Sequence, residues 1–199
     1  MTKTLSEIPL AFEPGSKWQY SVSIDVLGRL IEIWSGKSFE TFLAERVFQP
    51  LDMKDTGFFV PKSKADRFTA NYGPGLPGKL RTIDDPAKSR YLKKPSLASG
   101  GGGLVSTTRD YLRFLQMILN GGELHGQRLL KKKTVRMMTS NQLPKKLMPI
   151  QIGQPPRTGI GFGLGFNVRV AMSDWDPGGK VGEFGWGGAA STHYWASPG

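Results

Sequence analysis

Residues 160–170 alternate bulky apolar residues with small or polar ones, and this pattern constrains the fold more than any other part of the sequence. The segment reads IGFGLGFNVRV, with Gly161, Gly163, Gly165, Asn167 and Arg169 at the alternate positions. Successive side chains of a strand point to opposite faces, so the pattern predicts one strand with a bulky face and a nearly bare face. Another element must pack very close to the bare face, because glycine presents no side chain there.

Helical patterns precede this segment. Residues 20–35 carry apolar side chains four residues apart, which predicts a helix with one buried stripe formed by Val22, Val26, Leu30 and Trp34, with Leu27 and Ile31 beside them. Gly36 is expected to end this helix, and Ser38 to cap a second one that reaches Pro50. A third helix is expected after a cap at Ser106 or Thr107, and a fourth near residues 132–139 after a hairpin-like turn.

The order of these elements predicts the fold class. Residues 189–196 read as a second, antiparallel strand, so helices and strands are segregated along the chain. This segregation indicates an α+β fold, with an antiparallel sheet flanked by helices. Residues 73–103 are rich in Pro, Gly and Lys, and such a long connection often forms a wall of a functional site.

Composition restricts the functional classes. The chain has 199 residues, enough for one domain, and no cysteine, which excludes disulfide scaffolds, thiolate metal sites and thiol nucleophiles. It shows neither a membrane span nor the apolar run of a signal peptide, which favours a soluble, cytoplasmic protein. The net charge of +11 suits an anionic partner, but no nucleic-acid-binding motif accompanies it, so nucleic acid is not an expected partner.

The sequence lacks the common motifs of nucleophiles and metal sites. It contains neither a G-x-S-x-G elbow nor an S-x-x-K motif. His125 and His193 lie in a glycine-flanked turn and on a predicted strand, where structural roles outweigh catalysis, and no metal-ligand spacing is present. The glycine run 100–103 lacks the Gly-Lys-Ser/Thr ending of a phosphate loop, which favours a tight turn before a helix. No metal or cofactor is expected.

Five segments, taken in order, resemble the serine β-lactamase and penicillin-binding-protein superfamily. They are WQYSVSIDVLGRLIE, PLDMKDTGF, SGGGGLVSTTRDYLRFLQMILNGGEL, GFGLGF and VGEFGWGGAASTHYWASP, and the resemblance covers residues 10–198. The segments are most similar to the class C-like branch, in particular the family VIII carboxylesterases. The resemblance implies a β-lactamase/transpeptidase-like fold and acyl transfer through a serine.

The resemblance assigns the second family motif to Tyr20 and its two successors. Tyr20 matches the tyrosine that helps move protons. The alternative is a purely structural role, in which Tyr20 stands at a helix start and its hydroxyl is bonded to a loop. A free tyrosine has a pKa near 10, so a base at neutral pH needs nearby cations, such as the family's upstream lysine. Ser21 and Val22 are expected in the pocket, and Val22 replaces an Asn that in β-lactamases would bind a substrate amide.

The third family motif falls on Trp186, Gly187 and Gly188. These residues match the esterase form and would bind substrate, with the Ala189 N–H as one oxyanion-hole donor. The alternative to a substrate-binding role for Trp186 is a structural role as an aromatic residue of the core. The tryptophan stands where β-lactamases carry a Lys or His that would bind a β-lactam carboxylate, so neutral short-chain esters are the expected substrates.

The family's S-x-x-K motif has no counterpart in this sequence. The resemblance therefore implies that residues 1–199 form a single partial hydrolase domain, without the serine-bearing N-terminal part and without the last strand and helix. Such a chain should not form an acyl-enzyme by itself. Its sheet would also have exposed edges, which favour self-association.

The favoured function is a portion of a serine hydrolase that cleaves short-chain carboxylic esters through an acyl-serine intermediate. One alternative is β-lactamase or D-amino-acid peptidase activity on the same fold. A second alternative is a non-catalytic basic binding protein, which the net charge of +11 would suit.

Overall fold

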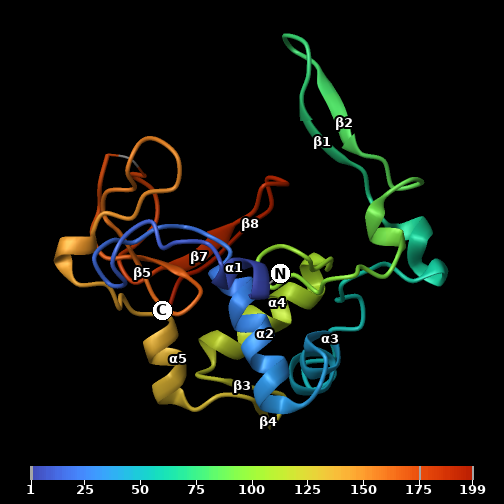
Figure 1. Cartoon of the computed structure of the whole chain (residues 1–199), viewed down its shortest axis with the longest axis horizontal. Helices are drawn as coiled ribbons and strands as arrows, with labels where there is room; N and C mark the ends of the chain where they lie inside the picture. Colours follow the sequence, from blue (N-terminus) through green and yellow to red (C-terminus); the bar gives the residue numbers. More distant parts are fainter. Residues whose placement is uncertain (1, 175, 199) are drawn as a thin grey trace.

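The computed structural model describes residues 2–174 and 176–198 and combines helices with an antiparallel sheet (Figure 1). The helices are α1 (Thr2–Ser6), α2 (Ser23–Ser35), α3 (Phe39–Leu43), α4 (Thr108–Leu119) and α5 (Lys132–Met138). A π-helical turn (Ala44–Phe48) continues α3, and short 3-10 helices cover Lys62–Arg67, Arg90–Leu92 and Lys145–Leu147. The strands are β1 (Asn71–Pro74), β2 (Leu80–Asp84), β3 (Glu123–Leu124), β4 (Gln127–Arg128), β5 (Ile160–Phe162), β6 (Asn167–Arg169), β7 (Phe184–Gly187) and β8 (His193–Ala196). The predicted α+β class is confirmed.

The main sheet has the strand order β5-β6-β7-β8, and each neighbouring pair is antiparallel. The prediction of one strand over residues 160–170 is wrong, because the chain reverses between β5 and β6. The Gly163 N–H donates to the Phe166 carbonyl at 2.8 Å across this reversal. Gly165 has a φ of +93°, which glycine adopts at little steric cost. β8 is the second predicted strand, although it begins at His193 rather than at 189.

Local sequence signals set the helix boundaries as predicted. Gly36 ends α2 in the left-handed conformation, with a φ of +68°. The Ser38 side chain accepts a hydrogen bond from the Thr41 N–H at the start of α3, and Thr107 does the same for the Asp110 N–H at α4. The hairpin-like turn before α5 is formed by β3 and β4. Each of these features depends on residues within one or two turns.

One hydrophobic core lies between the main sheet and helices α4 and α5. Its buried members are Phe48, Leu51, Met53, Met117, Ile118, Leu124, Val135, Phe166, Val168, Phe184 and Ala196. On the sheet, the rings of Phe166 and Phe184 lie 5.1 Å apart between centroids. Tyr194 of β8 packs on Tyr111 of α4 at 4.7 Å, and burial raises the pKa of both hydroxyls. These contacts fix α4 against strands β7 and β8.

Helix α2 leaves most of its apolar surface open to solvent. Gly28 is the one residue of this helix that is buried, whereas Leu27 is 49% exposed and Trp34 is 76% exposed. The predicted buried stripe is therefore wrong for this chain, because periodicity shows which face is apolar and not what covers it. An exposed apolar face of this kind marks an interaction surface. No helix among the described residues is long and apolar enough to cross a membrane.

Residues 71–84 form a hairpin that stands clear of the other elements in Figure 1. The sequence predicted only an irregular connection here. β1 and β2 pair in antiparallel register from Asn71 and Asp84 to Pro74 and Leu80. The tip is a turn over residues 76–79, in which the Lys79 N–H donates to the carbonyl at position 76 at 2.8 Å. Pro followed by Gly at the centre of a turn favours this geometry.

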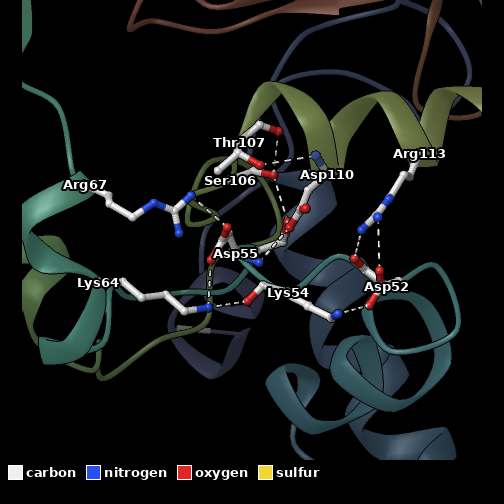
Figure 2. Close-up of polar contacts among 10 residues, drawn as sticks. Asp52, Lys54, Asp55, Lys64, Arg67, Ser106, Thr107, Asp110 and Arg113 are labelled. Carbon is white, nitrogen blue, oxygen red and sulfur yellow. Dashed lines mark hydrogen bonds and ion pairs between the residues drawn. The ribbon is translucent and has the colours of Figure 1, made fainter.

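The Asp110 carboxylate, in the first turn of α4, accepts hydrogen bonds from the segment PLDMKDTGF (Figure 2). The residue is 3% exposed, and its Oδ2 atom accepts hydrogen bonds from the Asp55 N–H at 2.7 Å and from the Thr56 hydroxyl at 2.9 Å. The Thr56 hydroxyl also lies 2.8 Å from that of Ser106. Two segments far apart in the sequence thus share one buried carboxylate.

The Asp55 carboxylate is expected to make folding stability depend on pH. Hydrogen bonds from Arg67 and then Lys64, with ion-pair distances of 2.9 and 2.7 Å, lower the pKa of Asp55 from 3.8 to about 2 (Figure 2). Because the folded pKa lies below the unfolded value, the ionised group stabilises the fold fully above about pH 4, and this contribution disappears as the pH falls through about 2.

Urea titrations at several pH values test this expectation. Between about pH 4 and pH 2 the free energy of unfolding should fall more steeply for the wild type than for Asp55→Asn, by on the order of 1 kcal/mol once solvent screening is considered. Parallel curves for the two proteins would show that the Asp55 ion pairs contribute nothing.

Candidate active site

Strand β7 carries Trp186 and Gly187 from the core to the end of the sheet. Trp186 lies opposite Tyr194 of β8, and Gly187 lies opposite His193. Trp186 is two residues beyond the buried Phe184, so both side chains lie on the same face of the strand. A Cβ atom at position 187 would stand 2.6 Å from the His193 Cδ2 atom. A side chain at position 187 would therefore require the His193 ring to move.

Tyr20 contacts Trp186, so the structure brings the two predicted motifs together. Tyr20 lies just before α2, and its ring centroid is 5.5 Å from that of Trp186, with 40° between the planes. Tyr20 is 47% exposed, which leaves its hydroxyl accessible to a ligand. Within residues 2–174 and 176–198, no side chain forms a hydrogen bond with this hydroxyl.

Two further aromatic residues extend this contact into a row. Phe162 of β5 lies 5.4 Å from Trp186 and 5.4 Å from Trp18, measured between ring centroids. The row Trp18–Phe162–Trp186–Tyr20, called here the aromatic wall, therefore joins the segment before α2 to two strands of the sheet. Sequence reasoning missed Trp18 and placed Phe162 only on a bulky strand face. The available signal was the position of Trp18, two residues before Tyr20.

The turn after β7 holds the other predicted residues of the third motif. The Gly188 N–H donates to the Thr192 carbonyl at 2.8 Å, and the Ser191 N–H donates to the Gly188 carbonyl at 3.0 Å. Ala189 is exposed at the top of this turn, and its N–H has no backbone acceptor in the described part of the chain. His193 closes the turn, with its Nδ1 atom 3.2 Å from the Ser191 carbonyl. Among the described residues, the Ala189 N–H thus lacks a backbone acceptor, whereas the N–H groups of Gly188 and Ser191 have one.

Ser21 and Val22 lie between Tyr20 and helix α2, with Val22 at the N-cap position. The Ser21 hydroxyl lies 2.9 Å from the Ser23 hydroxyl, and the Val22 carbonyl accepts hydrogen bonds from the N–H groups of Asp25 and Val26. The Val22 side chain is 49% exposed. Both residues are therefore exposed in the segment that follows Tyr20.

The glycine run 100–103 packs against the same end of α2. A Cβ atom at Gly100 would lie 2.8 Å from the Ile24 carbonyl oxygen, and one at Gly101 would lie 2.7 Å from Asp25 Oδ2. The Gly101 N–H donates to Asp25 Oδ1 at 3.4 Å. The run therefore serves a close backbone approach that supports the helix start after Tyr20.

The clearest cavity, of about 240 Å³, lies away from the aromatic wall, and neither Tyr20 nor Trp186 lines it. Its apolar lining includes Phe48, Phe58 and Phe68. Its charged lining residues are already engaged in ion pairs, namely Glu40 with Lys94, Lys54 with Asp52, and Asp55 with Lys64 and Arg67. The cavity therefore offers no unpaired charge for a polar ligand.

No metal centre is evident in the described part of the chain. Within residues 2–174 and 176–198, no group of three or more His, Asp or Glu side chains could hold a metal ion. His125 lies in the turn between β3 and β4 with a φ of +49°.

The structure has an antiparallel sheet flanked by helices, with Tyr20 before α2 in contact with Trp186 at a strand end. Its fold is of the β-lactamase/transpeptidase-like class. The Beta-lactamase family model matches residues 1–199, and the chain belongs to this family. Protein Rv1367c of Mycobacterium tuberculosis is 35% identical over 199 residues, which cover 98% of this chain and 49% of that protein. The chain thus spans about half the length of this relative.

Two esterase-related proteins are also similar. Esterase EstB of Burkholderia gladioli is 35% identical over 130 residues, which cover 58% of this chain and 33% of that protein. The solved structure of EstCE1, described as a hydrolase with promiscuous acyltransferase activity, superposes with a TM-score of 0.76 at 25% identity, over 96% of this chain and 51% of EstCE1. These matches support the superfamily and the fold implied by the sequence motifs.

Proposed function

We propose that this chain is part of a serine hydrolase that cleaves short-chain carboxylic esters. The observation that carries the proposal is the contact between Tyr20 and Trp186, which joins the second and third family motifs at 5.5 Å between ring centroids. The similarity to a protein named Esterase EstB and to the hydrolase EstCE1 supports ester chemistry. β-Lactamase or D-amino-acid peptidase activity remains the second candidate, supported by the family match alone.

Each predicted residue takes a defined part in this proposal. The Tyr20 hydroxyl moves the proton between the nucleophilic serine and the leaving alcohol, assisted by a cation that favours the phenolate. The Ala189 N–H donates to the carbonyl oxygen, on which negative charge develops in the transition state. Gly187 and Gly188 let the substrate approach the backbone, while Ser21 and Val22 line the pocket beside Tyr20.

The aromatic wall favours a neutral acyl group over a charged one. Trp18, Phe162 and Trp186 offer apolar ring surface and no cation for a carboxylate. Val22 likewise offers no amide to a substrate amide group. The proposal therefore gives esters precedence over penicillins and peptides.

In this proposal the chain forms only part of a larger hydrolase domain. The chain spans 49% of Protein Rv1367c, and helix α2 exposes an apolar face next to Tyr20. In the proposed domain, a serine- and lysine-bearing segment covers this face and places the nucleophile opposite Trp186. Without that segment, the exposed face and the edge strands β5 and β8 promote self-association.

A chimera tests the proposed activity. It joins the part of EstB that precedes the matched segment to this chain and is called here the EstB chimera. The expected result is hydrolysis of p-nitrophenyl butyrate by the EstB chimera and none above buffer by the chain alone, because in this proposal the EstB part supplies the nucleophilic serine that this chain lacks.

The substrate comparison uses a chromogenic cephalosporin in the same assay. A kcat/KM for the cephalosporin above that for the ester would favour the β-lactamase alternative. A folded EstB chimera that hydrolyses neither substrate would refute the proposed role of this chain.

A further inference from the structure

Near its tip the β1–β2 hairpin has an apolar face and a face with two basic residues. Further along β2 the second face also carries Ile83, whose Cδ1 atom would lie 2.2 Å from a Cβ atom at Gly73. Residues directly opposite in an antiparallel pair share a face, and the faces alternate along each strand. Tyr72 pairs with Thr82 and Pro74 pairs with Leu80, so these residues lie on one face. Arg81 pairs with Gly73 and therefore lies on the other face, as does Lys79 by alternation.

The tip of the hairpin is apolar, exposed and held in a defined shape. Leu76 and Leu80 are 72% and 74% exposed, and Tyr72 is 55% exposed. The turn hydrogen bond from Lys79 and a second hydrogen bond, from Arg81 Nε to the Pro74 carbonyl at 3.1 Å, hold the two strands together at this end. Among the described residues these apolar side chains are thus largely open to solvent. They lie at the end of an arm that stands clear of the body (Figure 1).

The charge near the tip of the hairpin has one sign, whereas Asp84 lies at the opposite end of β2. Residues 71–83 contain Lys79 and Arg81 and no acidic residue. The chain as a whole carries a net charge of +11, so a negatively charged surface attracts it from a distance. Apolar side chains beside lysine or arginine suit the boundary between acyl chains and phosphate headgroups, where the apolar part is buried and the cation stays at the headgroups.

We infer that the β1–β2 hairpin docks on an anionic lipid surface, with Leu76 and Leu80 inserted and with Lys79 and Arg81 at the phosphates. A convex tip on a projecting arm reaches a flat surface before any other part of the molecule. Charge complementarity identifies that surface as an anionic bilayer, because the basic pair lies next to the two leucines rather than elsewhere on the chain. The inference is independent of the proposed ester hydrolysis.

Vesicle sedimentation with the chain itself tests this inference. Vesicles of phosphatidylcholine alone are compared with vesicles that contain phosphatidylglycerol as well, at low and at moderate salt. We expect binding only to the anionic vesicles. The double variant Leu76→Ser/Leu80→Ser should lower the partition coefficient about tenfold or more, and Lys79→Gln/Arg81→Gln should lower it about tenfold.

Matched controls separate the hairpin from the overall charge. Lys145→Gln/Lys146→Gln removes the same charge from another exposed loop, and Leu104→Ser replaces a leucine that is 41% exposed outside the hairpin. Both controls should bind within about twofold of the wild type. Circular dichroism melting of all variants should be unchanged, because the altered side chains are exposed.

Three outcomes would overturn the inference. Equal losses in the hairpin and control variants would show general charge attraction without a specific contact. Equal binding to neutral and anionic vesicles would remove the role of the basic pair. A chain whose oligomers dissociate with Leu76→Ser/Leu80→Ser on size-exclusion chromatography, and which does not bind vesicles, would identify a second copy as the occupant of the hairpin.

Discussion

Replacing Tyr20 by phenylalanine in the EstB chimera is expected to lower kcat for p-nitrophenyl butyrate roughly 10²–10⁴-fold, the usual contribution of a positioned acid or base. The substitution keeps the ring that lies 5.5 Å from Trp186 and removes only the hydroxyl. KM should change little, because the aromatic wall, which is the proposed substrate contact, is retained. Steady-state kinetics on the purified EstB chimera provide the measurement.

Tyr72→Phe is the matched control for this prediction. Tyr72 is 55% exposed on β1, and its hydroxyl has no part in the proposed reaction. It should leave kcat unchanged, and both variants should melt at the temperature of the parent protein. A Tyr20→Phe variant with kcat within threefold of the parent would exclude Tyr20 from proton transfer and leave it a purely structural member of the wall.

Asp110→Ala is expected to destabilise the chain by about 2–4 kcal/mol. The substitution leaves the Asp55 N–H and the Thr56 hydroxyl without their acceptor at a site where Asp110 is 3% exposed (Figure 2). Buried donors that lose a charged acceptor still carry the free-energy cost of their desolvation, and the hydrogen bond that offset this cost is gone. The midpoint of urea unfolding, followed by tryptophan fluorescence, measures the effect.

Two further variants make this result specific. Asp66→Ala removes an exposed carboxylate from the neighbouring 3-10 helix and should change the free energy of unfolding by less than about 0.5 kcal/mol. Asp110→Asn keeps one acceptor oxygen and should fall between the wild type and Asp110→Ala. A loss of less than about 1 kcal/mol for Asp110→Ala would mean that the segment PLDMKDTGF is held by its apolar contacts alone.

The sequence predicts the local features of the fold well because they depend on few residues. The Gly36 stop and the Ser38 and Thr107 caps follow from hydrogen bonds within a turn of the helix. The strand over residues 160–170 failed because glycine fits both a bare strand face and a reversal, and the choice depends on pairing with β7. The exposure of α2 could not be predicted from periodicity either, because an apolar stripe does not show which element, if any, covers it.

The candidate site shows the same division. Tyr20 and Trp186 could be placed together because family motifs specify residue types in order. Phe162 and Trp18 could not, because their approach depends on the register of β5 and on the path of the segment before α2. The hairpin at residues 71–84 was missed because it has only four or five residues in each strand and its pairing is not supported by core packing.

The arrangement of the aromatic wall has a consequence for how substrate range can diverge in proteins of this kind. Trp186 shares its strand face with Phe184, which is 2% exposed in the core. A shift of the β7 backbone at Trp186 would therefore displace a core side chain and destabilise the fold. Phe162 and Trp18 lie on an edge strand and on a segment outside the main sheet. Evolution or engineering can therefore reshape the outer half of the wall at small thermodynamic cost, while the half next to Tyr20 stays fixed.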